Sequence, residues 1–526
     1  MQMRTYIFPS LLCLFLASCG NNHYNPPLSP KVSVSDEEVA YDSYMMESPQ
    51  GNETFQKIHE NTFVEVTNQP VSTFSVDVDR AAYSNIRRMI SNGSLPPKDA
   101  VRIEEMINYF DYDYPAPSPE TRSPLQVSPE VSVAPWDSSH LLLRIGLQAK
   151  KIDLSKAPNS NIVFLIDVSG SMYDQNKLPL LKSSLKMLLG KLKAEDKVSI
   201  VTYASGTAVA LKPTSVRERE QIEKVLDDLE ASGGTSGSKG IQLAYKQAQE
   251  AFIKNGNNRI ILATDGDFNI GINNPNDLKE FIEKQRESGI YLTVLGFGMG
   301  NYRDDMVETL ANSGNGNYAY IDNIMEAKKV LINEFGGTLF TVAKDVKLQV
   351  EFNPKYVKSY KLIGYENRML ANEDFIDDKK DAGEIGSGHT ITAIYEVIPS
   401  QGEIAQSLRY QTQQLNENGK GNEIAFLKIR YKDPKEKGGQ SVEVTEPLFY
   451  TPKEYTQATE DFRFAMSVAE FGLLLRESSD KGASSYEQVL ELAKNAIGKD
   501  EEGYRKEFVR LVESAKLLSE QKMKKE

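Results

Sequence analysis

Cysteine, histidine and tryptophan are scarce in this chain of 526 residues, which has two cysteines, four histidines and one tryptophan. Cys13 and Cys19 are too few for a disulfide scaffold or a cysteine-based metal site. No apolar run reaches about 18 residues, so we expect no bundle of membrane-spanning helices. Basic residues are also in the minority, with 61 Lys and Arg against 74 Asp and Glu and a net charge of −13. This balance argues against nucleic-acid binding, which needs clustered positive charge.

The remaining composition is that of a globular protein, with 40% hydrophobic and 26% charged residues. At roughly 150 residues per domain, the length predicts about three or four domains.

The first residues have the features of a secretory signal. Arg4 precedes a short apolar core at residues 7–16, which is too short to span a bilayer comfortably. The stretch Leu16-Ala17-Ser18-Cys19 resembles the lipobox of bacterial lipoproteins, which implies that Cys19 becomes lipidated. An ordinary signal peptide with an incidental cysteine is the alternative. We therefore expect a signal peptide at 1–18 and a protein attached by lipid to a membrane of the bacterial cell envelope, facing the periplasm or the surface.

The rest of the chain divides by its hydrophobic pattern. A polar stretch at the start predicts a flexible tether, and the segment after it mixes strands with helices. Apolar strands then alternate with helices, which predicts a doubly wound, mostly parallel α/β sheet. Alternating strands follow and indicate a β-sandwich, which strands near residues 127–148 are expected to join, so that the α/β domain is inserted in it. Amphipathic helices end the chain. The predicted segments are 19–62 (tether), 63–160 (N-terminal flank), 161–335 (α/β domain), 336–455 (sandwich) and 456–526 (helical segment).

Oxygen-bearing side chains cluster after the apolar strands of the α/β domain. One strand ends in Asp167-Val168-Ser169-Gly170-Ser171 and another in Thr264-Asp265-Gly266, while a glycine-rich loop carries Thr235 beside Ser236. Loops at the carboxyl ends of strands meet at the topological switch point of an open α/β sheet. Two carboxylates and three hydroxyls are hard ligands, which select Mg²⁺, Mn²⁺ or Ca²⁺. Because the hydroxyls are neutral, a carboxylate from a partner would complete both the geometry and the charge.

The combination of D-x-S-x-S, a later threonine and T-D-G resembles the metal-ion-dependent adhesion site (MIDAS) of von Willebrand factor type A (VWA) domains. The resemblance implies a VWA fold. It also implies a metal site built from five residues: Asp167, Ser169, Ser171, Thr235 and Asp265. The stretches STFSVDVDRAAYSNIRR and VRIEEMINYFDYDYP resemble the N-terminal flank of bacterial secreted or lipid-anchored A-domain proteins. The stretch YKLIGYENRMLANEDFIDDKKDAGEIGSGHTITAIYEV resembles their C-terminal region.

A binding protein is therefore the leading interpretation: a divalent cation in the VWA domain would hold an acidic group of a protein partner. One alternative is an envelope scaffold with a structural metal ion. The other is a metal-assisted hydrolase, which would need a positioned general base that the sequence does not offer. We accordingly expect no enzymatic activity.

Overall fold

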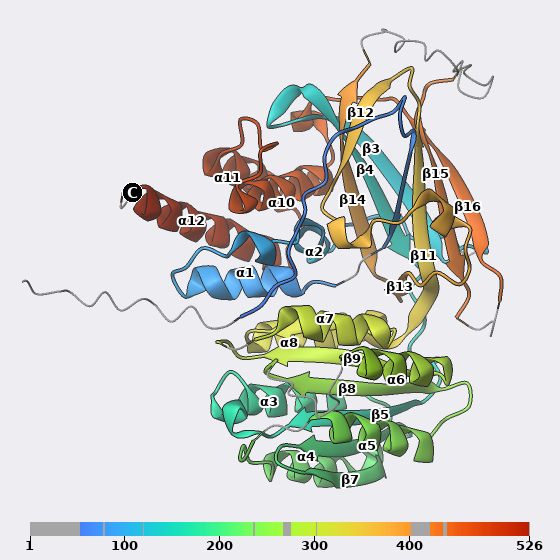
Figure 1. Cartoon of the computed structure of the whole chain (residues 1–526), viewed down its shortest axis with the longest axis vertical. Coiled ribbons are helices and arrows are strands. Elements are labelled where there is room, and N and C mark those ends of the chain that lie inside the picture. Colours follow the sequence, from blue (N-terminus) through green and yellow to red (C-terminus); the bar gives the residue numbers. More distant parts are fainter. Residues whose placement is uncertain are drawn as a thin grey trace, which may run out of the picture. The chain divides into compact units, whose positions relative to one another are not determined.

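The computed structural model describes residues 53–76, 79–118, 120–234, 237–266, 275–300, 302–400, 421–434 and 439–524. They form an α/β domain, a β-sandwich and a group of helices that we call the helical unit (Figure 1). No helix in the described ranges has the length and apolar character needed to cross a membrane.

The α/β domain contains a six-stranded sheet in the order β10-β9-β8-β5-β6-β7. All neighbours are parallel except β6 and β7, and every residue of β5 and β8 is buried. Strands buried on both faces require helices on both sides, as the sequence predicts. The strands are β5 (Ser160–Asp167), β6 (Lys197–Tyr203), β7 (Thr207–Ser215), β8 (Asn257–Thr264), β9 (Ile290–Phe297) and β10 (Tyr318–Ile321).

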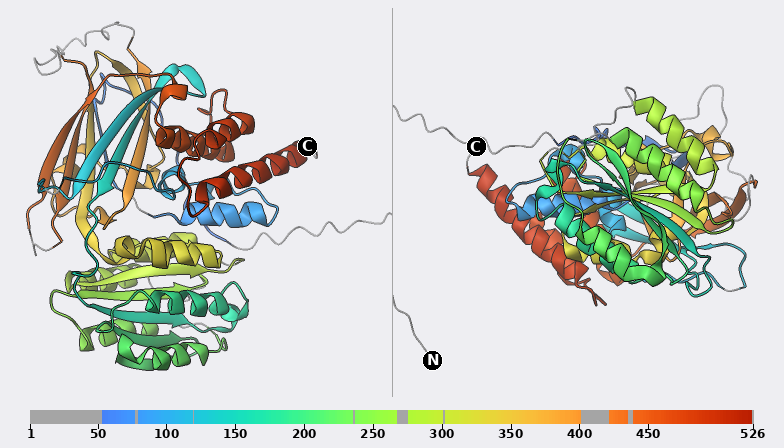
Figure 2. Two further views of the ribbon diagram at one scale, coloured as in Figure 1. Left: turned by 180° about the vertical axis from the view of Figure 1, so that it is seen from behind. Right: turned by 90° about the horizontal axis from the view of Figure 1, so that it is seen from below.

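Helices cover both faces of this sheet (Figure 2, right). Apolar side chains of α3, α4, α8 and α9 share one core with the sheet, and those of α5, α6 and α7 share the other. The helices are α3 (Leu178–Leu189), α4 (Arg219–Asp227), α5 (Gly237–Glu250), α6 (Pro275–Glu287), α7 (Asp304–Ser313), α8 (Ile324–Lys328) and α9 (Phe335–Leu339).

The sandwich consists of two antiparallel sheets that share one apolar core. One has the order β1-β12-β14-β4-β3; the other has the order β13-β11-β15-β16, with β2 also paired to β11. Strands that precede the α/β domain thus pair with strands that follow it, which confirms the predicted insertion. The strands are β1 (Val64–Glu65), β2 (Val71–Ser75), β3 (Leu125–Ala134), β4 (Asp137–Ala149), β11 (Thr341–Phe352), β12 (Val357–Ile363), β13 (Gly383–Gly386), β14 (Thr390–Pro399), β15 (Glu423–Lys432) and β16 (Val442–Phe449).

The helical unit contains helices from both the N-terminal and the C-terminal part of the described chain. Two helices of the N-terminal flank and the three C-terminal helices bury their apolar faces in one core, so the C-terminal stripes serve packing within the molecule. The helices are α1 (Ala81–Ser91), α2 (Ile103–Asn108), α10 (Glu460–Arg476), α11 (Tyr486–Lys494) and α12 (Tyr504–Met523).

Arginines of the N-terminal flank connect the helical unit to the α/β domain. Arg87 of α1 forms ion pairs with Asp322 at 2.5 Å and Glu326 at 2.7 Å in the α/β domain, and with Glu507 of α12 at 2.8 Å. Arg102 pairs with Asp304 of α7 at 2.7 Å. Arg87 and Arg102 are both buried, so these contacts are part of the interior.

The signal peptide and most of the predicted tether lie outside the described residues. Residues 53–62 are described, and they are bonded to the body instead of extending away from it. Glu53 pairs with Arg88 at 2.8 Å, Thr54 donates to Asp305 at 2.7 Å, and Asn61 donates to the carbonyl of Gly364 at 2.9 Å. The predicted tether therefore does not extend to residue 62, because side-chain bonds hold this polar stretch in place.

The acidic side chain of Glu470, in the helical unit, has a testable effect on stability. Glu470 of α10 is fully buried, and burial raises the pKa of its carboxyl from 4.5 to about 8. Between pH 4.5 and 8 the folded chain keeps this proton while the unfolded chain loses it. Stability is therefore lost as pH rises through this range.

We expect Glu470→Gln to raise the free energy of unfolding at pH 8 by on the order of 3 kcal/mol, and to have little effect near pH 4.5. Urea unfolding at both pH values measures the difference. Glu491→Gln, at an exposed position of α11, is the control and should change stability little at either pH. Equal effects of Glu470→Gln at the two pH values would contradict the prediction.

Candidate functional site

The first loop of the predicted site follows β5 directly. Asp167 is the last residue of this central strand and is fully buried. Its carboxylate accepts a hydrogen bond from the backbone N–H of Ser169 at 2.8 Å, which turns the chain back over the strand end. The hydroxyls of Ser169 and Ser171 then lie 3.0 Å apart. Both hydroxyls and the Asp167 carboxylate are thus gathered at the carboxyl end of β5.

The third loop reaches the same place from the neighbouring strand. Ile166 of β5 lies opposite Ala263 of β8, so Asp167 and Thr264 end adjacent parallel strands. The Thr264 hydroxyl is 3.5 Å from the Asp167 carboxylate, and Asp265 follows as a side chain that is 3% exposed. The structure thereby brings the two predicted aspartates to one edge of the sheet, as expected for strands on either side of a switch point.

The second loop is described only in part. Gly233 accepts a hydrogen bond from the backbone N–H of Gly170 at 2.9 Å, and the N–H of Gly234 donates to the Ser205 hydroxyl at 2.8 Å. Gly233 has a φ of +78°, and a Cβ there would lie 2.5 Å from the Ser205 hydroxyl oxygen, so a glycine is needed. The glycine-rich loop therefore lies against the D-x-S-x-S turn. Thr235 and Ser236 lie outside the described residues.

Burial sets the electrostatics of this edge. It raises the pKa of Asp167 to about 6, and the nearby Asp265 carboxylate acts in the same direction. Burial also raises the pKa of Tyr203, which ends the strand beside β5, well above its ordinary value. A negative charge on Asp167 is thus unfavourable without a positive charge close to it.

Lys177 supplies a positive charge that the sequence pattern does not predict. Its ammonium donates to the Asp265 carboxylate at 3.0 Å and to the backbone carbonyl of Ser171 at 2.9 Å. The side chain is only 10% exposed. Its aliphatic part lies against Gly298, where a Cβ would come within 2.3 Å of the Lys177 Cε. Lys177 is therefore built into the site by packing as well as by charge.

The donor set fits a hard divalent cation. Asp167, Ser169, Ser171 and Asp265 offer carboxylate and hydroxyl oxygens, which Mg²⁺, Mn²⁺ and Ca²⁺ prefer. The ammonium of Lys177 already pairs with one of these carboxylates, that of Asp265. In the described ranges, no cluster of three or more His, Cys, Asp or Glu side chains is placed to hold a metal ion. The predicted site has only two residues of these types and depends on hydroxyls for the remainder.

A groove of about 440 Å³ lies next to this edge. One wall comes from α1 and α12, including Arg88 and Arg510. The other wall includes Asn176 and Met299, the chain neighbours of Lys177 and Gly298. The groove thus lies between the helical unit and two residues, Asn176 and Met299, that adjoin the candidate metal site along the chain.

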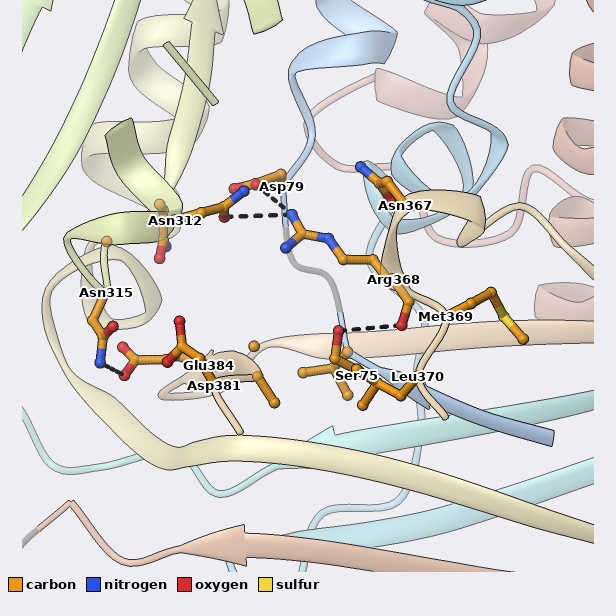
Figure 3. A pocket seen from close by; sticks show the side chains of 15 residues that line it. Ser75, Asp79, Asn312, Asn315, Asn367, Arg368, Met369, Leu370, Asp381 and Glu384 are labelled. Carbon is orange, nitrogen blue, oxygen red and sulfur yellow. Dashed lines mark hydrogen bonds and ion pairs between the residues drawn. The ribbon is translucent and has the colours of Figure 1, made fainter. Parts of the chain in front are cut away.

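A second hollow, of about 190 Å³, lies between the α/β domain and the sandwich (Figure 3). Its charged side chains are already paired. Arg368 donates to Asp79 at 3.3 Å, Asn315 donates to Glu384 at 2.7 Å, and Asp381 pairs with Arg286 at 2.9 Å. These bonds join the two parts of the molecule, which is a structural role.

Three protein families match successive parts of the chain. Residues 49–144 match the family "von Willebrand factor", and residues 161–332 match "von Willebrand factor type A domain". Residues 337–518 match the family "Uncharacterized protein YfbK, C-terminal". The matches on either side of the α/β domain agree with the predicted resemblance of these regions to the flanks of bacterial A-domain proteins.

The chain is also similar along most of its length to individual proteins. "Uncharacterized protein YfbK" of Escherichia coli is 44% identical over 475 residues, which are 88% of this chain and 81% of that protein. "Uncharacterized protein sll0103" of Synechocystis is 26% identical and covers 61% of this chain and 72% of its own length. Among solved structures, "von Willebrand factor type A from Catenulispora acidiphila" is 16% identical with a TM-score of 0.41. That match covers 72% of this chain and 88% of the other.

Proposed function

The chain belongs to the family of Escherichia coli YfbK and carries a VWA domain, and on this premise we propose that the domain binds a protein partner through a divalent cation. Asp167, Ser169, Ser171, Thr235 and Asp265 would hold the ion, with Mg²⁺ as the first candidate and Mn²⁺ or Ca²⁺ as alternatives. A carboxylate of the partner would complete the coordination shell. The proposal is a binding role and not an enzymatic one.

One observation carries this proposal: two carboxylates and two hydroxyls from separate loops meet at one edge of the sheet. Burying charged groups together is costly unless an opposite charge or a bound ion offsets them. A dication would offset both aspartates, and the hydroxyls would leave part of its coordination shell open to an oxygen ligand from outside. An acidic group is therefore the ligand that this edge favours.

The partner would contact more than the ion. The groove beside the site continues onto α12, so a partner docked on the sheet edge would also meet the helical unit. We further propose that lipid attached to Cys19 anchors the protein in the cell envelope, where the partner would lie within reach of the body.

Photocrosslinking in intact cells tests the proposal. We expect the wild type to form a crosslink from Asn176, beside the site, that disappears after chelation and in Asp167→Ala. A probe at exposed Phe252, on the opposite side of the domain, serves as the matched control position. A crosslinked product that persists in both Asp167→Ala and chelated cells would overturn metal-dependent binding.

A further inference from the structure

Lys177 is placed where it changes what a loaded metal site would attract. Its ammonium lies 3.0 Å from one oxygen of Asp265, and its position is held by a second bond to the Ser171 carbonyl. The side chain follows the exposed turn at Tyr173 but turns inward and is 10% exposed. A lysine on a polar turn normally extends into water, so burial at this point needs a specific reason.

The contact with Gly298 shows that the fold makes room for this lysine. Gly298 directly follows β9 with a φ of +79°, and any side chain there would collide with the Lys177 stem. The apolar part of the lysine therefore packs against Gly298, which leaves no room for a side chain there. Its charged end bonds to Asp265 and to the Ser171 carbonyl.

We propose that Lys177 is a positioning residue that holds Asp265 and keeps the loaded site positively charged, which makes an anionic partner a requirement for tight occupancy. This inference rests on the proposed metal-dependent function. Two aspartates would neutralise a divalent cation, and Lys177 adds one further positive charge. The ammonium also engages one oxygen of Asp265, which leaves that carboxylate less available for direct coordination. A carboxylate from the partner then restores neutrality.

Two affinities are expected to change in opposite directions when this charge is removed. Lys177→Met keeps the apolar stem beside Gly298 and removes the ammonium. The full chain with Lys177→Met should bind Mn²⁺ more tightly than the wild type, by on the order of ten- to a hundredfold, because a repelling charge is gone. Acetate, as a carboxylate probe, should bind the Mn²⁺-loaded variant about tenfold more weakly than the loaded wild type.

Electron paramagnetic resonance of free Mn²⁺ measures the first affinity, and water-proton relaxation of bound Mn²⁺ during acetate titration measures the second. Lys177→Arg keeps the charge but changes the shape of the side chain, and its two affinities should stay nearer to those of the wild type than to those of Lys177→Met. Lys191→Met removes an exposed positive charge elsewhere in the domain and should change neither affinity. If Lys177→Met fails to fold by circular dichroism, Lys177→Gln replaces it as the neutral variant.

The outcomes separate this inference from the proposed function. Tighter Mn²⁺ binding together with weaker acetate binding supports the role of Lys177. Equal or weaker Mn²⁺ binding by the neutral variant, or an unchanged response to acetate, overturns that role while leaving metal binding by the wild type intact. A wild type that binds no Mn²⁺ overturns the proposed function itself.

Discussion

Replacing Asp167 with asparagine is expected to weaken Mn²⁺ binding by about a hundredfold or more and to stabilise the metal-free protein. The first effect follows because Asp167 is the buried carboxylate at the centre of the donor set. The second follows from the pKa of about 6 that burial imposes on it. At pH 7.5 the folded protein carries a buried charge that the unfolded chain exposes to water. Removing this charge should add about 1–3 kcal/mol to the free energy of unfolding.

The sign of the second effect can be tested with pH. Near pH 4 the folded protein keeps Asp167 protonated and about half of the unfolded chains do as well, so the stability gain from Asp167→Asn should largely vanish. Thermal unfolding in the presence of chelator at pH 7.5 and pH 4 measures this change. Asp196→Asn is the matched control, because Asp196 is also buried but bonds to the backbone of Ser160 and Lys193. If Asp196→Asn lost Mn²⁺ affinity, or if Asp167→Asn kept it, the proposed metal site would be contradicted.

Replacing Arg87 with methionine is expected to lower the free energy of unfolding by about 3–5 kcal/mol. Arg87 lies among Asp322, Glu326 and Glu507, and the first two of these carboxylates are nearly inaccessible to water. Methionine has similar length but no charge, so the change leaves buried carboxylates without their main cation. Urea unfolding followed by circular dichroism measures the loss.

A second substitution shows whether that loss comes from unbalanced charge. Glu326→Gln introduced together with Arg87→Met should recover part of the stability, because fewer buried negative charges remain uncompensated. Arg510→Met, at an exposed arginine of α12 in the same groove, should cost less than about 1 kcal/mol. If Arg87→Met lowered the free energy of unfolding by less than about 1 kcal/mol, or if the double variant recovered no stability, packing and not charge would explain the result.

The fold was largely predictable because its signals are local. The apolar run of β5 ends in Asp167, that of β8 is followed by Thr264 and Asp265, and leucines at helical spacing come after the first of them. Pairings across long separations were harder to predict. The pairing of β2 with β11 joins residues about 275 positions apart, and no local pattern identifies the partner of a short strand. The docking of residues 53–62 depends on single side-chain bonds, which composition does not reveal.

The candidate site also has residues with a local sequence signal and one residue without it. The types and order of Asp167, Ser169, Ser171 and Asp265 could be read from the chain, because their spacing on strand ends is distinctive. Lys177 could not, since it stands in a polar turn among ordinary surface residues. The only available sign was its place just before the helix that begins at Leu178. Its role depends on Gly298, about 120 residues later, and only the folded sheet brings the two together.

The insertion of the α/β domain into the sandwich determines which of its edges can vary freely. The link from β4 leads into the amino end of β5, and Leu154 of that link lies 3.6 Å from the position of a Cβ on Gly336, in the returning helix α9. Both covalent joints therefore lie side by side at the edge opposite to Asp167. Loops at the carboxyl edge can change without disturbing either covalent joint, except where Asp322, just after β10, pairs with Arg87 of the helical unit.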